Sequence, residues 1–192
     1  MAKSLAGYMH FVWASLIKQG QMGAILPSQR FLVAKMIAPI PESYDGQILE
    51  LGAGNGSLTV RLAQERPRAR ILACEINPTL ANANRLNLSG TGLNTRVEVI
   101  SDSAENLLSE MAGRNAKNVD YIVSGVPIGN FGRKRTMALI DLISGNLRPG
   151  GMYIQYQHFL ADHRKIKAKF ASMQTIPVLL NFPPAFVYYA KK

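Results

Sequence analysis

The sequence predicts an α/β fold built on a mostly parallel sheet with helices on both faces, and three observations support this. From residue 47 onward, short apolar runs alternate with stretches of helical pattern, which is typical of right-handed βαβ units. The chain has 192 residues, of which 47% are hydrophobic and 18% charged, so it can bury a sizeable core. The first apolar run ends in a glycine-rich loop that opens a helical stretch, where open α/β sheets bind their ligands.

Seven apolar segments rich in Ile, Val and Leu are predicted to be strands: 47–51, 70–75, 96–101, 119–124, 152–157, 175–180 and 185–190. Helices are predicted over 57–66, 78–88, 103–112, 133–146 and, with a basic composition, 161–171. Residues 148–151 (Arg-Pro-Gly-Gly) should close the fourth of these helices. The last two strands flank an Asn-Phe-Pro-Pro turn, so they are expected to form an antiparallel pair at the sheet edge.

An amphipathic helix is predicted ahead of this domain. Its apolar side chains recur at i, i+3, i+4 and i+7: Leu5, Tyr8, Met9, Val12, Trp13 and Leu16. The apolar run 5–17 is too short for a bilayer span, which takes about 20 residues. Its aromatic residues and flanking lysines suit a helix that lies in the membrane interface, and the alternative is a helix that covers one side of the core. We therefore divide the chain into residues 1–40, membrane-associating and substrate-covering helices, and the ligand-binding domain 41–192.

The charge of the chain is strongly positive and unevenly placed. Lys and Arg number 22 against 12 Asp and Glu, which gives a formal net charge of +10. No acidic residue precedes Glu42 and none follows Asp162, so both ends are purely basic. This predicts a negatively charged partner, either nucleic acid or an anionic membrane surface. The alternative for any one cluster is a solvated helix face.

Cysteine and histidine usage excludes several classes of site. The single cysteine, Cys74, rules out an internal disulfide framework and a four-cysteine zinc site, and it fits a reducing compartment. His10, His158 and His163 show no metal-ligand spacing. We therefore expect no metal centre.

The strongest motif is the loop 50–56, Glu-Leu-Gly-Ala-Gly-Asn-Gly. Glycines let the backbone turn sharply and approach a ligand closely. A dinucleotide fingerprint would need its third glycine at position 57, which is Ser57. With glycines at 52, 54 and 56 and an acid at 50, the loop resembles motif I of the class I S-adenosylmethionine (SAM) methyltransferases.

This resemblance implies a Rossmann-like fold and SAM as the cofactor. A carboxylate near the loop favours the cationic sulfonium and ammonium groups of SAM. Glu75, at the end of the second strand, is placed to accept from the ribose hydroxyls, and in the family the position of Asp102 accepts from the adenine amino group. The alternative for both acids is a helix cap. The cofactor-binding residues expected on this basis are Glu50, Gly52, Ala53, Gly54, Gly56, Glu75, Ile76, Asp102, Ser103, Ala104 and Ser124.

The fourth strand runs into the loop 124–131, Ser-Gly-Val-Pro-Ile-Gly-Asn-Phe, at the position of the family's acceptor loop. Base-methylating relatives, such as the ribosomal RNA adenine dimethylases, carry a polar residue before the x-Pro pair and an aromatic residue after it, which stacks on the base. Here these positions hold Gly125 and Ile128. A base acceptor therefore loses support, whereas an alkylamine needs no stacking surface.

At this point the sequence resembles the short, peripheral bacterial phospholipid N-methyltransferases. The resemblance covers most of the chain and rests on residues 23–28, 124–131 and 181–185 together with the amphipathic N-terminal helix. Ile128 and Gly129 depart from the pattern, in which larger residues follow the proline. The resemblance implies methylation of phosphatidylethanolamine towards phosphatidylcholine by a monomer on the cytoplasmic face of the inner membrane. Ornithine-lipid N-methyltransferases look similar.

The implied reaction is direct displacement by a neutral amine held in line with the methyl group. Backbone carbonyls of residues 124–126, with Ser124 and Val126 among them, are expected to orient the acceptor amine, with Asn130 and Tyr156 nearby. Those expected around the lipid headgroup are Tyr8, Arg30, Phe131 and Arg133. The alternatives are a ribosomal RNA adenine N6-methyltransferase, an N-methyltransferase of a soluble amine, and a SAM-binding protein without catalytic activity.

Overall fold

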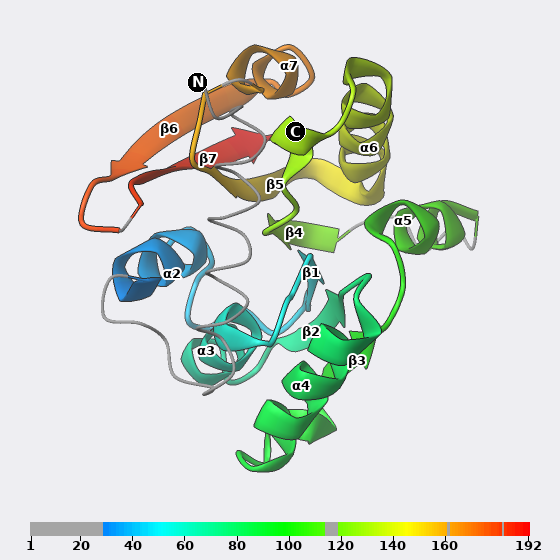
Figure 1. Cartoon of the computed structure of the whole chain (residues 1–192), viewed down its shortest axis with the longest axis vertical. Helices are drawn as coiled ribbons and strands as arrows, with labels where there is room; N and C mark the ends of the chain where they lie inside the picture. Colours follow the sequence, from blue (N-terminus) through cyan, green and yellow to red (C-terminus); the bar gives the residue numbers. More distant parts are fainter. Residues whose placement is uncertain (1–28, 114–118, 161, 182) are drawn as a thin grey trace, which may run out of the picture.

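One seven-stranded sheet lies between two layers of helices in this computed structural model, which describes residues 29–113, 119–160, 162–181 and 183–192 (Figure 1). The strand order is β3-β2-β1-β4-β5-β7-β6. The strands are β1 (Gln47–Leu51), β2 (Arg70–Cys74), β3 (Val97–Ile100), β4 (Val119–Ser124), β5 (Leu147–Gln157), β6 (Ser172–Val178) and β7 (Ala185–Lys191). The predicted N-terminal amphipathic helix, with Tyr8, lies outside the described residues.

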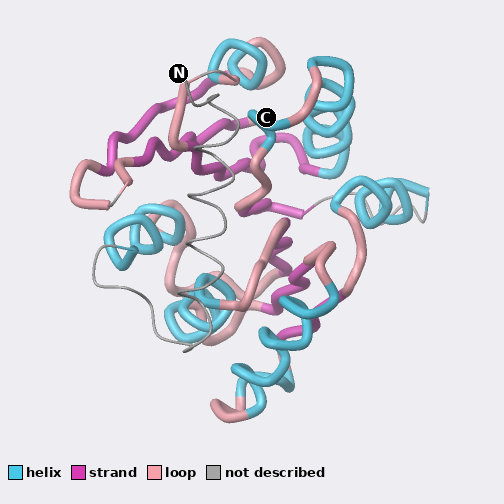
Figure 2. Tube along the Cα trace, viewed as in Figure 1, coloured by secondary structure: helices cyan, strands magenta, loops and turns pink. Residues whose placement is uncertain are grey.

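The sheet is mixed, which corrects the prediction of a mostly parallel one. Strands β1 to β5 pair in parallel, but β7 pairs antiparallel with both β5 and β6. The reason is that a short turn joins β6 to β7, and short turns connect antiparallel neighbours. Figure 2 shows the strands as one continuous layer between the helices. The predicted antiparallel pair at the sheet edge is confirmed.

Helices cover both faces of the sheet, and each face has its own core. The helices are α2 (Gln29–Ile37), α3 (Ser57–Glu65), α4 (Pro78–Ser89), α5 (Ala104–Gly113), α6 (Arg133–Asn146) and α7 (His163–Lys167), with short 3-10 helices η2 (Leu93–Thr95) and η3 (Ile128–Asn130). Buried side chains of α2, α3 and α4 pack on one face, and those of α5, α6 and α7 on the other. No helix in the described ranges has the length and apolar character needed to cross a bilayer.

Two elements differ in extent from the prediction. Strand β5 begins at Leu147 rather than 152, because the Pro-Gly-Gly segment joins the sheet: Gly150 takes a φ of 79°, and the backbones of Gly150 and Gly151 hydrogen-bond to Lys192. Helix α7 ends at Lys167 rather than 171. Beyond it, the buried Phe170 ring stacks on Tyr153 of β5 at 5.8 Å, which turns the chain towards β6.

Helix α2 is fixed to the domain by Arg66, a buried arginine just beyond α3. Its guanidinium Nε donates to the carbonyl of Ile40 at 2.7 Å and Nη2 donates to the carbonyl of Ile37 at 3.0 Å. These carbonyls end α2 and the turn after it, so one side chain satisfies backbone acceptors that the helix leaves open. Helix α3 starts at the carboxyl edge of the sheet and runs away from it to Arg66. Because Arg66 binds the last turn of α2, the first turn of α2, with Arg30, lies on the side of the carboxyl edge.

Replacing Arg66 with alanine should lower the free energy of unfolding by about 2–4 kcal/mol, since the Ile40 carbonyl loses the guanidinium donor, the Ile37 carbonyl keeps only the Ile40 N–H, and a buried side chain is removed. Arg66→Lys should recover little, because an ammonium cannot reproduce the guanidinium fork. Urea unfolding measures the loss. The control is Arg61→Ala, which removes a half-exposed ion pair with Glu65 and should cost below about 1 kcal/mol. Equal effects of the two alanine variants would contradict this role of Arg66.

Candidate functional site

The loops that follow β1, β2, β3 and β4 gather at the carboxyl edge of the sheet. The backbone N–H groups of Gly52 and Ala53 donate to the Cys74 carbonyl at the end of β2, at 2.8 and 3.0 Å. The N–H of Gly125, after β4, donates to the Leu51 carbonyl at 2.8 Å. The glycine loop is therefore bonded to both neighbouring strand ends, and the predicted cofactor loop and acceptor loop lie side by side.

The glycine loop has the backbone that its sequence predicts. Gly52, Gly54 and Gly56 all have positive φ, at 71°, 59° and 90°, a region that side chains strongly disfavour. A Cβ at Gly56 would lie 2.2 Å from Oδ1 of Asn84 on α4, whereas a Cβ at Gly54 would meet no atom of the described residues within 4 Å. The space beside Gly54 is therefore open and can receive a ligand close to the backbone.

Glu75 follows β2 directly and faces this loop. It is buried, and its two carboxyl oxygens accept from the backbone N–H of Gly54 at 2.9 Å and of Asn77 at 2.8 Å. Each oxygen has a second acceptor position left, so the carboxyl group can still receive hydroxyl donors. Ile76 is exposed beside it and offers an apolar surface. Both residues thus lie beside the glycine loop, and their role in cofactor binding stays a prediction.

Glu50 is buried beneath the glycine loop and is not on its ligand-facing surface. Its side chain is 1% exposed, and its Oε2 has no hydrogen-bond partner among the residues that the structure describes. Burial is the main cause that raises the pKa of Glu50 to about 8, opposed by a hydrogen bond from Thr59. The protonated carboxyl therefore predominates at neutral pH, and the predicted negative charge beside the loop falls to Glu75.

The third acid, Asp102, stands at the end of β3 and organises the start of α5. Its Oδ1 accepts from the N–H of Ser103 at 2.6 Å and from the Asn106 amide at 2.9 Å. Ser103 Oγ accepts from the Asn106 backbone at 3.1 Å, as a helix cap does, and Ala104 is buried. The Cys74 thiol donates to the Asp102 carbonyl at 3.1 Å, which joins this turn to the end of β2.

The acceptor loop and the glycine loop touch through their backbones. A Cβ at Gly52 would lie 3.0 Å from the Val126 nitrogen, and a Cβ at Gly125 would lie 3.0 Å from the Gly52 carbonyl oxygen. Glycine at both positions therefore allows the two loops to approach more closely than side chains permit.

Ser124 and Val126 stabilise the backbone of the acceptor loop, and their side chains do not lie on its surface. Ser124 is fully buried, and its Oγ accepts from the Val126 N–H at 3.2 Å. The Val126 carbonyl accepts from Ile128 N–H at 2.8 Å and from the Gln155 amide at 3.1 Å. The Val126 carbonyl thus already accepts two hydrogen bonds. The prediction that backbone carbonyls of this loop orient an amine is therefore restricted to the carbonyls of Ser124 and Gly125.

Gln155 is a site residue that the sequence reasoning missed. It is fully buried on β5, and Tyr153 donates to its Oε1 at 2.5 Å. A glutamine inside a strand of Tyr, Ile and Met is a signal in itself, since a buried amide needs partners. Asn84, which donates to Thr59 at 3.1 Å beneath the glycine loop, carries the same signal within α4.

The next two loop residues explain the departure from the family pattern. Ile128 is fully buried in the core against α6, so its side chain points away from any acceptor. A Cβ at Gly129 would lie 3.1 Å from Oδ2 of the buried Asp162 and 3.5 Å from Oε1 of Gln157. A larger residue at 129 would have to displace these polar groups.

Tyr156 is the aromatic side chain that the structure brings to the acceptor loop. A Cβ at Gly125 would lie 3.4 Å from its ring carbon Cε1. Burial raises the pKa of Tyr156, so its hydroxyl stays protonated. The neighbouring His158 ring meets the Tyr156 ring edge-on at 5.8 Å, and His158 Nδ1 lies 3.0 Å from the Pro184 carbonyl. Because a carbonyl only accepts, Nδ1 carries a proton and Nε2 is the acceptor in neutral His158.

The remaining predicted substrate residues are spread along the same edge. The Phe131 ring is half-buried, and the Arg135 guanidinium covers it at 4.0 Å from the centroid, so one ring face already has a cation. Asn130 and Arg133 are exposed, in η3 and at the start of α6. Arg30 is exposed on α2, over the Phe31 ring. The structure thus brings Tyr156 to the loop, and it leaves Asn130, Arg133 and Arg30 at the solvent boundary.

These residues fit the predicted cofactor. The open space beside Gly54 lies next to the Glu75 carboxyl, which suits a ribose, and Ile76 and Asp102 border the adjoining strand ends. Glu50 holds an unpaired buried oxygen beneath the loop, and a cation in the loop would favour its ionised form. Within the described ranges, no group of three or more metal-ligating side chains is brought together.

Comparison with known sequences agrees with the motif. The sequence profile described as "Methyltransferase small domain" matches residues 27–180. The chain is 24% identical over 178 residues to the ornithine lipid N-methyltransferase of Singulisphaera acidiphila, and the alignment covers 88% of each chain. It is 32% identical over 103 residues to ribosomal RNA small subunit methyltransferase C of Salmonella choleraesuis. That second match covers 54% of this chain and 28% of the relative.

Solved structures show the same fold. The O-methyltransferase of Bacillus cereus, determined in complex with S-adenosylhomocysteine (SAH), superposes with a TM-score of 0.70 at 17% identity. The superposition covers 93% of this chain and 90% of that one. The Rossmann-like methyltransferase fold predicted from the sequence is thereby confirmed.

The buried Glu50 predicts a pH dependence of stability. Its pKa is about 8 in the folded chain and 4.5 in the unfolded one, so its contribution is fully present below pH 4.5 and is lost as the pH rises through 8. The slope is on the order of 1 kcal/mol per pH unit between these values. Thermal unfolding from pH 5 to 9 should therefore show a flatter profile for Glu50→Gln than for the wild type. Glu98→Gln, on an exposed residue of β3, is the control and should keep the wild-type slope; equal slopes in all three proteins would contradict the burial argument.

Proposed function

We propose that this chain, which belongs to the methyltransferase small domain family, transfers methyl groups to the headgroup amine of a membrane aminolipid. Family and fold make the chain a SAM-dependent methyltransferase, and what is proposed is the acceptor. The first candidate is phosphatidylethanolamine, methylated towards phosphatidylcholine at the cytoplasmic face of the inner membrane. The second is an ornithine lipid, which the similarity to the Singulisphaera acidiphila enzyme favours.

The acceptor loop is the observation that carries this proposal. At the place where base methyltransferases carry a stacking aromatic, Ile128 is buried in the core. At the place of their polar side chain stands Gly125, pressed against the Gly52 carbonyl. A flipped base would find neither a stacking surface nor a side-chain acceptor there, whereas a primary amine needs neither.

The extent of similarity supports the same choice. The alignment with the ornithine lipid enzyme spans 88% of both chains, while the ribosomal RNA enzyme shares only 28% of its own length with this chain. A match of this length is what a shared cofactor-binding core alone would give. A ribosomal RNA acceptor remains the alternative that the experiment must test.

The chain's own residues would act mainly by position. SAM supplies an activated methyl group, and the amine nitrogen forms the new N–C bond as the S–C bond breaks. The amine must first lose a proton, which burial beside the loop favours because desolvation lowers an ammonium pKa. Backbone carbonyls of Ser124 and Gly125 would orient the amine, and the Tyr156 ring would lie beside the methylated cation. Holding nitrogen and carbon in line can supply about 7–11 kcal/mol.

The charged residues at the solvent boundary suit the rest of the headgroup. Arg133 begins α6 directly after the acceptor loop, and Arg30 lies in the first turn of α2. Both are exposed and would offer guanidinium donors to a phosphate or carboxylate. Asn130, in η3 near the end of the loop, is also exposed and adds a polar side chain to this border.

Methyl transfer from radiolabelled SAM tests the proposal. The full chain is incubated with anionic vesicles that contain phosphatidylethanolamine or an ornithine lipid, and in parallel with ribosomal RNA. Label should enter the lipid fraction, and chromatography of the products counts the methyl groups. Label in RNA alone would overturn the lipid assignment.

A further inference from the structure

Exposed apolar side chains are concentrated at one place on the described surface. Six large hydrophobic residues are exposed among the described residues, and four of them lie in two loops: Phe159 and Leu160 after β5, and Leu179 and Leu180 after β6. Leu179 and Leu180 are 73% and 69% exposed. We call these four residues the apolar rim. Contiguous exposed apolar residues of this kind mark interaction sites rather than ordinary surface.

The two loops of the apolar rim are held together at the carboxyl edge of the sheet. Gln157 of β5 and Pro177 of β6 are both register partners of Phe186 on β7, so β5 and β6 run in the same direction and end at the same level. The His158 ring, beside the first loop, hydrogen-bonds to the Pro184 carbonyl in the second at 3.0 Å. The rim is therefore one surface, on the acceptor side of the site.

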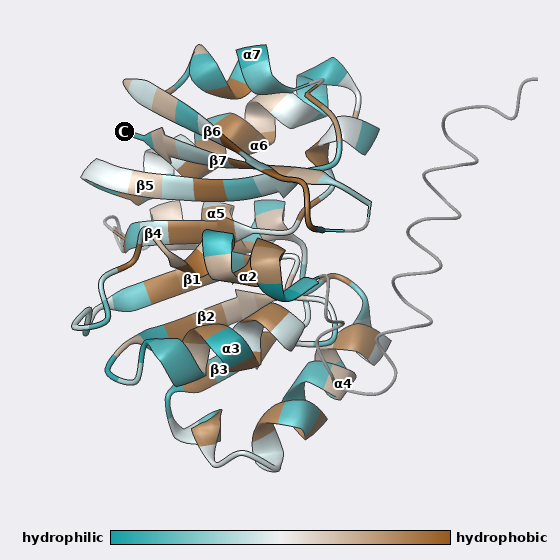
Figure 3. Ribbon diagram, turned by 90° about the vertical axis from the view of Figure 1, so that its left-hand side faces the viewer, coloured by the Kyte–Doolittle hydropathy of each residue, from teal (hydrophilic) through white to brown (hydrophobic). Residues whose placement is uncertain are grey.

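Positive charge borders the apolar rim. Every charged residue after Asp162 is Lys or Arg, and Figure 3 shows α7 as largely hydrophilic. Two of the basic residues near α7 are neutralised, Lys165 by Asp162 and Lys169 by Asp141. Arg164 and Lys167 are exposed, and neither forms an ion pair with another described residue.

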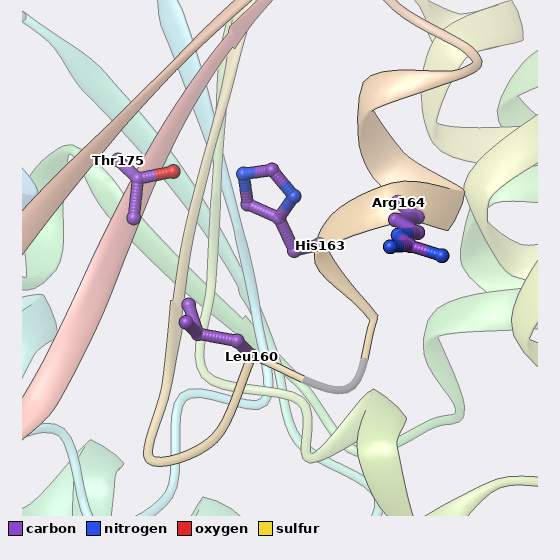
Figure 4. A pocket seen from close by; sticks show the side chains of 4 residues that line it. All are labelled: Leu160, His163, Arg164 and Thr175. Atoms are coloured by element: carbon purple, nitrogen blue, oxygen red, sulfur yellow. The ribbon is translucent and has the colours of Figure 1, made fainter.

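Apolar, polar and cationic side chains line an open depression of about 480 Å³ beside α7. It is lined by Leu160, His163, Arg164 and Thr175, and Figure 4 shows these side chains coming from the β5–α7 loop, α7 and β6. A guanidinium and a hydroxyl next to a leucine match the boundary of a lipid leaflet, where a phosphate lies next to hydrocarbon.

We propose, on the basis of the proposed function, that the apolar rim docks the folded domain on an anionic phospholipid bilayer. The four side chains enter the hydrocarbon boundary, while Arg164 and Lys167 pair with lipid phosphates. This contact uses residues other than those of the predicted N-terminal helix. It would orient the acceptor side of the site towards the headgroup layer. The amine to be methylated then reaches the acceptor loop without leaving the membrane.

The test is sedimentation of the full chain with phosphatidylglycerol vesicles that also contain phosphatidylethanolamine or an ornithine lipid. Leu179→Ser with Leu180→Ser should weaken vesicle binding at least tenfold, because two large side chains lose their transfer into hydrocarbon. Leu86→Ser is the matched control: Leu86 is also 73% exposed, but it lies on α4, and its variant should bind like the wild type. Arg164→Gln should weaken binding at low ionic strength, with the difference shrinking in high salt. SAH affinity, measured by calorimetry, should stay unchanged in all variants and shows that they are folded.

Equal vesicle binding by the double variant, Leu86→Ser and the wild type would overturn the docking proposal, and so would binding of the wild type to RNA but not to vesicles. The proposed function fails separately. If the rim variants lose vesicle binding but the wild type methylates no lipid in those vesicles, docking stands and the acceptor assignment falls. If the wild type methylates the lipid and the double variant binds and methylates equally well, the acceptor assignment stands and docking falls.

Discussion

The close contact between the ends of β1 and β4 is the constraint on which the site depends. The Gly125 N–H donates to the Leu51 carbonyl at 2.8 Å, and a Cβ on either Gly52 or Gly125 would press on the other loop at 3.0 Å. Any side chain at these two positions would push the glycine loop and the acceptor loop apart. Methyl transfer needs its two reacting atoms in line within van der Waals distance. The distance between the two loops therefore limits how closely the methyl donor and the acceptor can approach each other.

The residues on the two sides of this contact differ in chemical character, and the strand order separates them. The order reverses between β1 and β4, where open α/β sheets bind ligands. On one side, β2 and β3 end in Glu75 and Asp102, whose carboxyl groups are bonded to loop N–H groups. On the other side lie Tyr156 of β5, the apolar rim after β5 and β6, and the basic residues that follow Asp162. In the proposed function, cofactor and acceptor would therefore approach from opposite halves of one edge, which suits a substrate that stays in a membrane.

The sequence predicts most of the fold because its signals are local. Alternating apolar runs define the strands within a few residues, and glycines at 52, 54 and 56 require the positive φ values that the structure shows. The parallel character of the sheet is overestimated, since a short turn makes β7 antiparallel to both neighbours. The early start of β5 depends on pairing with Lys192, a contact between segments far apart in the chain.

The site is predicted less completely, because burial and partners are properties of the tertiary structure. Glu50 belongs to the recognised motif, yet its depth and raised pKa follow from packing that no motif encodes. The Phe131 ring is covered by Arg135, and Gln155 holds Val126 from the next strand. Neither contact could be inferred from spacing along the chain.

The most direct test of this account is the calorimetric affinity for SAH of Gly54→Ala compared with Gly92→Ala. Both glycines have positive φ, at 59° and 70°, and at neither would a Cβ meet an atom within 4 Å, so both variants should fold with similar backbone strain. Only Gly54 lines the space beside the Glu75 carboxyl. We predict at least a tenfold loss of affinity for Gly54→Ala and wild-type affinity for Gly92→Ala. Equal affinities in the two variants would contradict the placement of the cofactor at this loop.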